Sequence, residues 1–256
     1  MLRATDVDKE DSIQEAEYGF PYHYIPERTE SKVTLVRSWH WGLKYLAGIE
    51  VIMEMISREP FNSLIEVGCG DGRLLREVSV RFPGKMLQGV DYSLRAIELA
   101  KAFNPNLDFQ VVDVTKEAPT QTFDVVLLSE VLEHIHPGDI KDFLHSLSVL
   151  MDKDSRMVIT VPHSNLRVIP KHFQHFTLAS LQEMISSHFS VVHHEFFDAE
   201  SGWFKRVKRL LMNRHYVILN HRVTRWLLKQ TIRMNASASE QDCLRLAVVC
   251  RKNSTN

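Results

Sequence analysis

The apolar positions of the chain follow two alternating patterns. From residue 62 onward, short runs rich in Val, Ile and Leu alternate with longer amphipathic segments. The apolar runs predict strands at residues 63–69, 85–91, 108–114, 123–130, 156–162, 190–197 and 243–252. The amphipathic segments predict helices at residues 71–82, 93–103, 138–151 and 177–189. Buried strands that alternate with helices are typical of βαβ units, in which helices cover both faces of a parallel sheet. The pattern therefore predicts a doubly wound, mostly parallel, seven-stranded α/β sheet.

Two segments lie outside this alternation, one near each end of the chain. Residues 1–17 are polar and residues 18–27 (YGFPYHYIPE) are rich in Tyr and Pro, so neither predicts a helix. Apolar residues then recur at helical spacing up to Glu59, and Ser38 is the predicted N-cap of that helix. We divide the chain into an N-terminal arm over residues 1–60 and one domain over residues 61–256, which carries a helical basic insertion over residues 199–240.

The charge of the chain is balanced overall but unevenly distributed. Its 256 residues include 31 Lys and Arg against 32 Asp and Glu, and 44% of them are hydrophobic. This composition is typical of a globular protein with a full core, and it excludes whole-chain disorder and a strong global field. Residues 1–30, however, hold eight acidic and three basic side chains, whereas residues 201–239 hold nine basic and no acidic ones.

The cysteines and the apolar runs predict a cytoplasmic protein. The three cysteines form neither an even framework nor a CxxC pair, which argues against a disulfide scaffold or a zinc knuckle. The N-terminal residues lack the apolar segment of a secretory signal, and no apolar run is long enough to span a bilayer. We therefore expect a reducing, cytoplasmic setting, with peripheral attachment to the inner membrane surface as an alternative.

A glycine-rich turn joins the first predicted strand of the domain to its first helix. It reads Glu66-Val-Gly-Cys-Gly-Asp-Gly-Arg73. Such a turn places backbone N–H groups and the positive end of a helix beyond the sheet. The dinucleotide pattern Gly-x-Gly-x-x-Gly is not met, because Arg73 occupies the place of its third glycine. The turn predicts a bound ligand at this edge of the sheet but counts against NAD.

Acidic residues lie at the ends of the next two strands. Asp91 ends the second strand, where a carboxylate can accept hydrogen bonds from both hydroxyls of a ribose. Asp113 lies at the end of the third strand, where a side chain can reach an adenine amino group. Because the ends of parallel strands meet at one edge of the sheet, the turn and the two acids predict a single ligand site.

These motifs, with the segment FDVVLLSEVLEHI and the later HFQHFT, resemble class I S-adenosylmethionine-dependent methyltransferases over residues 62–200. The resemblance implies a Rossmann-like fold, S-adenosylmethionine as the cofactor and methyl transfer as the activity. It implies that Gly68 and Gly70 pack under the methionine part, that Asp91 binds ribose, and that Asp113 lies by adenine. The residues that it places around the cofactor are Glu66, Gly68, Cys69, Gly70, Gly72, Asp91, Tyr92, Asp113, Val114, Ser129 and Glu130. The polar turn over residues 152–155 departs from the usual Pro/Gly-Gly turn of the family, without consequence for this site.

Histidines after the fourth and fifth strands are the candidate general bases. A sulfonium donor leaves as a neutral thioether, so the protein mainly aligns the acceptor and removes the proton of a hydroxyl. An imidazole suits that task near neutral pH. We expect His134 and His175 to converge over the methyl group, where either would act as the base, with Glu133 as their catalytic neighbour.

The same side chains allow two other interpretations. Glu130, Glu133, His134 and His175 are similar to the metal ligands of small-RNA 3′-terminal 2′-O-methyltransferases, and such ligands suit Mg²⁺ or Mn²⁺. The same letters recur in many metal-free small-molecule methyltransferases, so we expect no metal here. A purely structural hydrogen-bonding role is the third interpretation.

The resemblance to tailoring enzymes predicts a small molecule or glycan precursor as acceptor, methylated at a hydroxyl, with phosphorylated and lipid-linked acceptors included. RNA would be the acceptor in the metal-dependent alternative, and the remaining alternative is a non-catalytic partner subunit that binds S-adenosylmethionine.

N-terminal additions commonly form the substrate lid in this family, which assigns that role to residues 1–60, with their aromatic segment over residues 18–24. The basic insertion is a packed cap, a polyanion-binding patch or, through residues 203–233, a peripheral membrane contact.

Overall fold

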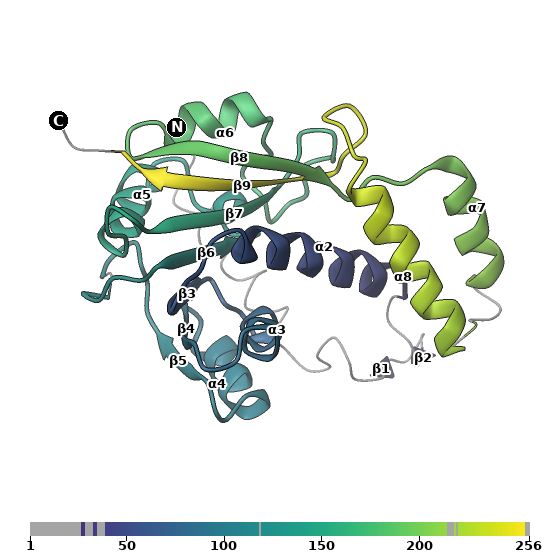
Figure 1. The fold of residues 1–256 in the computed structure, drawn as a ribbon, viewed down its shortest axis with the longest axis horizontal. Coiled ribbons are helices and arrows are strands. Elements are labelled where there is room, and N and C mark those ends of the chain that lie inside the picture. The colour runs from purple at the N-terminus through teal and green to yellow at the C-terminus, as the bar shows by residue number, and fades with distance from the viewer. Residues whose placement is uncertain are drawn as a thin grey trace.

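The computed structural model describes residues 27–28, 33–34, 39–117, 119–213, 218 and 220–253. Within these residues, seven strands form one sheet in the order β5-β4-β3-β6-β7-β9-β8 (Figure 1). The strands are β3 (Ser63–Val67), β4 (Met86–Asp91), β5 (Asp108–Val111), β6 (Val125–Ser129), β7 (Arg156–Pro162), β8 (Phe189–Phe197) and β9 (Arg245–Lys252). Paired strands run parallel, except that β9 runs antiparallel to both β7 and β8. The predicted mostly parallel, seven-stranded α/β sheet is confirmed.

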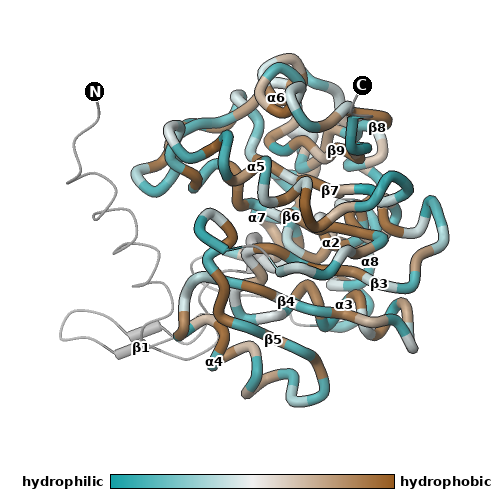
Figure 2. The backbone as a smooth tube through the Cα atoms, turned by 90° about the vertical axis from the view of Figure 1, so that its left-hand side faces the viewer, coloured by the Kyte–Doolittle hydropathy of each residue, from teal (hydrophilic) through white to brown (hydrophobic). Residues whose placement is uncertain are grey.

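Helices cover both faces of this sheet. The helices of the described residues are α2 (Trp39–Ser57), α3 (Arg73–Arg81), α4 (Leu94–Phe103), α5 (Ile140–Val149), α6 (Leu178–Ile185), α7 (Gly202–Leu211) and α8 (His221–Asn235), with the 3-10 turn η1 (Leu132–His134). Apolar side chains of α5 and α6 pack in one buried cluster, and those of α2, α3 and α4 pack in another. Successive strand residues point to opposite faces, so Val126 belongs to the first cluster and Leu127 to the second. The central strands are largely hydrophobic, and hydrophilic loops lie around them (Figure 2).

The insertion before the last strand is helical, as predicted. Helices α7 and α8 lie at one end of the molecule, beside the N-terminal part of α2 (Figure 1). Leu43 of α2 packs there with Phe204, Met212 and Leu227. None of the helices in the described part of the chain combines the length and the hydropathy of a membrane-crossing segment.

Most of the N-terminal arm lies outside the described residues. This holds for the aromatic residues 18–24 and for the predicted N-cap Ser38, so the lid stays a prediction. The described part of the arm contains a short antiparallel pair, β1 (Glu27–Arg28) with β2 (Val33–Thr34). The helix predicted in the last part of the arm, up to Glu59, is α2.

The antiparallel direction of β9 brings an additional residue to the edge where β3, β4, β5 and β6 end. Arg245, the first residue of β9, pairs in register with Pro162 and Phe197, the last residues of β7 and β8. Its side chain therefore lies at the same edge of the sheet as the glycine turn and Asp91. This edge carries the candidate site.

Candidate functional site

The glycine turn after β3 has a backbone conformation that requires glycine. Gly68, Gly70 and Gly72 have φ angles of 73°, 53° and 73°, in the left-handed region that side chains disfavour. A Cβ atom on Gly68 would lie 2.5 Å from Cγ2 of Val131. Backbone conformation and close packing both explain why the sequence places glycine at these positions.

Asp91, the last residue of β4, holds this turn in place. One of its carboxylate oxygens accepts a hydrogen bond from the Gly70 N–H at 2.9 Å, and the other accepts one from the Ser93 N–H at 2.9 Å. The residue is buried, at 7% exposure. Each carboxylate oxygen has a second lone pair, so the side chain can also accept hydrogen bonds from the two hydroxyls of a ribose.

Two adjoining cavities lie at this edge and share Gly68 and Glu130 in their walls. The first, of about 350 Å³, is also lined by the predicted cofactor residues Asp91, Tyr92, Asp113 and Val114. The second, of about 330 Å³, is also lined by Glu66, Cys69, Gly70 and Ser129. Gly72 lines neither cavity. It is the N-cap residue of α3 and packs against Phe109, since a Cβ atom there would lie 2.5 Å from Cζ of that ring. Its role is to let α3 begin close to the sheet.

Burial and local hydrogen bonds set the protonation of three groups along these walls. Burial raises the pKa of Glu66 well above its ordinary value. Burial also raises the pKa of the Cys69 thiol, which therefore stays protonated and unreactive. At Asp113, burial opposes ionisation, but hydrogen bonds from Lys116 and Thr115 prevail and hold the pKa of that carboxylate below its ordinary value. Asp113 is thus an ionised side chain bonded to its own loop.

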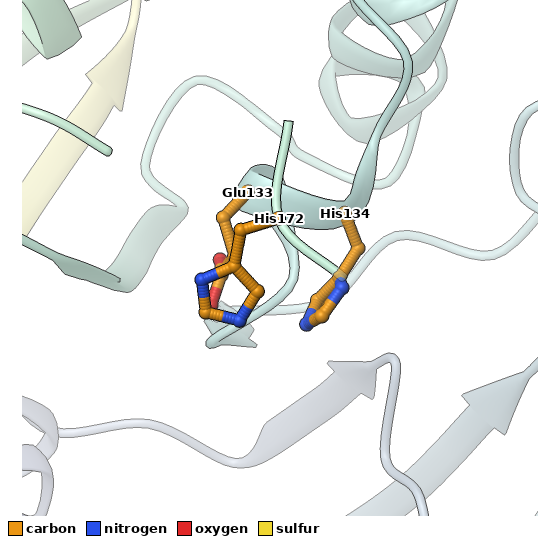
Figure 3. A group of neighbouring side chains, drawn as sticks. All are labelled: Glu133, His134 and His172. Carbon is orange, nitrogen blue, oxygen red and sulfur yellow. The ribbon is translucent and has the colours of Figure 1, made fainter. Parts of the chain in front are cut away.

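Glu133, His134 and His172 form a compact group (Figure 3), and it lies beside the first cavity because His134 lines that cavity. One ligating atom of each lies within 4.8 Å of the others. Glu133 and His134 belong to η1, and the segment that carries His172 is held against η1 because the Phe173 N–H donates to the Glu133 carbonyl at 2.8 Å. His134 is the member of the group that lines the cavity.

Backbone carbonyls determine the tautomers of the imidazoles. Nδ1 of His134 lies 2.8 Å from the Lys171 carbonyl, and Nδ1 of His175 lies 2.8 Å from the Leu166 carbonyl, so each of these nitrogens carries a proton. Nε2 of a neutral His175 is then an acceptor, and it accepts the hydrogen bond from Nδ1 of His172 at 2.7 Å. Burial, followed by the neighbouring His134, lowers the pKa of His172 to about 3. The ring of His172 is therefore neutral, with Nε2 as its acceptor nitrogen.

Glu133 is the buried carboxyl of this group. It is 0% exposed, and neither of its carboxyl oxygens has a hydrogen-bond partner within the described part of the chain. Burial, followed by the nearby Glu130, raises its pKa well above the ordinary value. Burial therefore favours the protonated, neutral form of Glu133, which lies beside the imidazoles of His134 and His172.

The two predicted catalytic histidines, His134 and His175, differ in their position relative to the cavities. His134 lines the first cavity, whereas His175 lines neither cavity and bonds to His172 instead. Of the four residues of the metal alternative, Glu133 and His134 belong to the compact group, and Glu130 and His175 do not. The sequence reasoning missed His172, although it lies three positions before His175 in the segment HFQHFT.

Sequence reasoning also missed a charged network on the wall of the second cavity. The Arg245 guanidinium donates to Glu130 at 2.9 Å and to Asp198 at 2.6 Å, and Lys44 lies 2.8 Å from the other oxygen of Asp198. Glu130 and Asp198 have φ angles of 56° and 62°, a costly conformation for residues other than glycine. With two acids and two bases, this network is polar but balanced in charge.

The two cavities together fit a nucleoside that carries a charged tail. The first offers a carboxylate for a ribose diol and the loop of Asp113 for a base. The second offers the backbone of the glycine turn with Glu66 and Ser129 for the tail. S-adenosylmethionine, expected from the sequence motifs, matches this arrangement of donors and acceptors.

Comparison with known proteins agrees with this assignment. A family model described as a methyltransferase domain matches residues 39–201, which is more than half of the chain. The ubiquinone biosynthesis O-methyltransferase of Pelagibacter ubique is 32% identical over 108 residues, or 41% of this chain and 43% of that protein. The malonyl-[acyl-carrier protein] O-methyltransferase 1 of Ilyobacter polytropus is 31% identical over 97 residues, or 37% of this chain and 35% of that protein. The chain thus matches less than half the length of these curated relatives.

Solved structures share the fold at low sequence identity. The 1,6-didemethyltoxoflavin-N1-methyltransferase of Burkholderia thailandensis has a TM-score of 0.59 and 16% identity, over 99% of this chain and 92% of that one. An S-adenosylmethionine-dependent methyltransferase of Archaeoglobus fulgidus has a TM-score of 0.56 and 18% identity, over 82% of this chain and 94% of that one. By its family match, its sheet and its glycine turn, the chain belongs to the class I S-adenosylmethionine-dependent methyltransferases, with S-adenosylmethionine as its cofactor.

Proposed function

We propose that the protein methylates a hydroxyl group of a small-molecule acceptor. The observation that carries this proposal is the group of Glu133, His134 and His172 beside the cofactor cavity. A hydroxyl must lose a proton as it is methylated, and imidazole groups with an acceptor nitrogen suit that step. The two curated relatives described above carry names of O-methyltransferases, which supports the same atom type.

The cofactor, when bound, supplies a methyl group on a sulfonium whose leaving group is a neutral thioether. The chain has to align the acceptor and to take its proton. His134 is our candidate for the general base, because it lines the cavity and its Nδ1 proton is held by the Lys171 carbonyl, so that Nε2 is its acceptor nitrogen. The ring of His172 packs edge-to-face against that of His134, with centroids 4.8 Å apart, and Glu133 lies beside both. His175 is a positioning residue, since its hydrogen bond orients His172.

The proposal is tested with methyl-labelled S-adenosylmethionine against phenols, small glycans, nucleotide sugars and short RNAs. With the acceptor that is found, His134→Gln should lower kcat by about 10²-fold to 10⁴-fold, the usual contribution of a general base. His136→Gln is the matched control, because His136 lines the same cavity outside the group. A purely structural His134 would leave the pH dependence of kcat unchanged in the variant, and methylation at nitrogen or carbon would also contradict the proposal.

Exhaustive chelation separates this mechanism from the metal-dependent alternative. We expect turnover to survive EDTA, because the proposed proton transfer uses protein groups alone. Loss of activity that Mg²⁺ or Mn²⁺ restores would instead assign Glu133, His134 and His172 to a metal site.

A further inference from the structure

Helices α7 and α8 carry a strongly basic outer surface, which the cofactor site does not use. No acidic residue occurs within residues 201–239. The exposed cations of the two helices are Lys205, Arg206, Arg209, Arg222, Arg225, Lys229 and Arg233. Four of them recur at spacings of three or four residues on α8 and therefore share one face of that helix. The opposite face, with Leu227, Thr231 and Asn235, is buried.

Large apolar side chains lie among these cations. Trp203 is 54% exposed, Leu210 is 68% exposed and Trp226 is 41% exposed. The buried ring of Phe204 lies between the two tryptophans, with centroid distances of 5.6 Å to Trp203 and 6.4 Å to Trp226. The tryptophans of α7 and α8 thus belong to one aromatic ridge that joins both helices.

An apolar cleft adjoins the basic face of α8 at Arg225. It measures about 510 Å³ and lies between α2 and α8. Leucines 43, 46 and 228 line it together with Arg225 and His221. An apolar cleft with a cation at its rim suits an acyl chain and its phosphate.

We propose that the α7–α8 surface binds an anionic lipid bilayer. The cations would lie at the phosphate level, where each contributes to attraction by negatively charged lipids. The tryptophan rings, with an apolar body and one polar N–H, suit the boundary between headgroups and acyl chains. Charge without exposed apolar side chains would fit any polyanion, so Trp203, Leu210 and Trp226 are the residues that favour a membrane.

Hydrogen bonds connect the buried face of α8 to the wall of the second cavity. Asn235, on the buried face of α8, accepts a hydrogen bond from the Asp198 N–H at 3.0 Å. Asp198 in turn bonds to Arg245 and Lys44 on the cavity wall. Asn235 of α8 therefore lies one hydrogen bond away from the wall of this cavity, because Asp198 itself lines it.

The experiment is co-sedimentation of the full-length protein with equimolar phosphatidylglycerol–phosphatidylcholine vesicles, with pure phosphatidylcholine vesicles as the uncharged reference. We expect binding to the anionic vesicles that weakens strongly between about 0.1 M and 1 M salt, as the Debye length falls from about 10 Å to 3 Å. The variant Arg222→Glu/Arg225→Glu/Lys229→Glu should bind at least about tenfold more weakly. Lys101→Glu/Lys141→Glu/Lys153→Glu is the matched control, because these exposed cations lie on other elements and the change of net charge is identical.

Quenching of tryptophan fluorescence by brominated lipid tests the apolar part separately. Wild type should be quenched, and Trp203→Phe/Trp226→Phe should lose most of that quenching although its charges are intact. The proposal is overturned if wild type does not sediment with anionic vesicles or if both triple variants behave alike. Binding of a short RNA without vesicle binding would assign the surface to nucleic acid instead. Because none of these readouts involves turnover, they stand apart from the proposed O-methylation, and calorimetric donor binding confirms that each variant is folded.

Discussion

At the scale of single residues, Asp91 connects the glycine turn to the first cavity through one carboxylate. Its oxygens bond to the Gly70 and Ser93 N–H groups at 2.9 Å each, and it lines the first cavity. Asp91→Asn replaces one acceptor oxygen with a donor that faces these N–H groups. We therefore expect S-adenosylmethionine to bind more weakly by about 1.5 to 3 kcal/mol, as for a lost charged hydrogen bond.

Isothermal titration calorimetry measures this loss directly. Asp142→Asn, at an exposed position of α5, is the control for the change of charge. Equal affinities of the two variants would remove Asp91 from the cofactor site.

Some residues of the site could be predicted from the sequence and others could not. Asp91 was predictable, because a strand end and a glycine turn place it without further information. His172 was not, because the segment that carries it is irregular, so its spacing from His175 does not say which ring reaches Glu133. Arg245 was missed for another reason: only the pairing of β9 with β7 and β8 places it at the site.

At the scale of elements, a buried arginine attaches α2 to the sheet. Arg156 of β7 is 2% exposed and donates to the carbonyls of Ile56 at 2.7 Å and Glu59 at 2.6 Å, at the end of α2. Carbonyls at a helix C-terminus lack partners within the helix, and a cation there also suits the helix dipole. Because α2 lines the second cavity, this attachment supports one wall of the site.

Removal of this side chain should destabilise the whole domain. We expect Arg156→Ala to lower the free energy of unfolding by about 2 to 3 kcal/mol, since it leaves buried carbonyls without partners. Arg58→Ala is the matched control at the same end of α2, because its ion pair with Glu195 is half exposed and such pairs contribute less than about 1 kcal/mol. Urea denaturation measures both, and equal losses would show that the contacts of Arg156 are dispensable.

The periodicity of apolar residues predicted where helices and strands occur better than it predicted which of their side chains are exposed. Buried runs of Val, Ile and Leu identify the central strands β3, β6 and β7, because a strand covered on both faces must be apolar throughout. In α7, however, Lys208 reads like the other cations of the insertion, yet it is 3% exposed and paired with Glu200. A helix pattern cannot show that an acid from outside the helix neutralises one of its cations. Reversal of Lys208 would therefore test burial rather than the outer surface.

At the scale of the whole molecule, buried titratable groups couple folding to pH. Burial raises the pKa of both Glu66 and Glu133 well above the ordinary 4.5. Above pH 4.5 the folded protein therefore keeps protons that the unfolded chain has released, and its stability falls as the pH rises through that window. His172 acts in the opposite direction: its pKa of about 3, against an ordinary 6.5, lowers stability as the pH falls below 6.5.

The two carboxyls should outweigh the single imidazole, which is only partly buried. For protein without cofactor, we expect the free energy of unfolding in urea to be higher at about pH 5.5 than at about pH 7.5, by roughly 1.4 kcal/mol per pH unit for each excess proton. Glu133→Gln removes one such proton, so the variant should be more stable than wild type at neutral pH and its stability should change less with pH. The gap between the two should close toward pH 4.5, where the unfolded carboxyl is also protonated. Parallel curves for variant and wild type would mean that Glu133 is ionised in the folded protein, and the neutral acid beside His134 would then have to be abandoned.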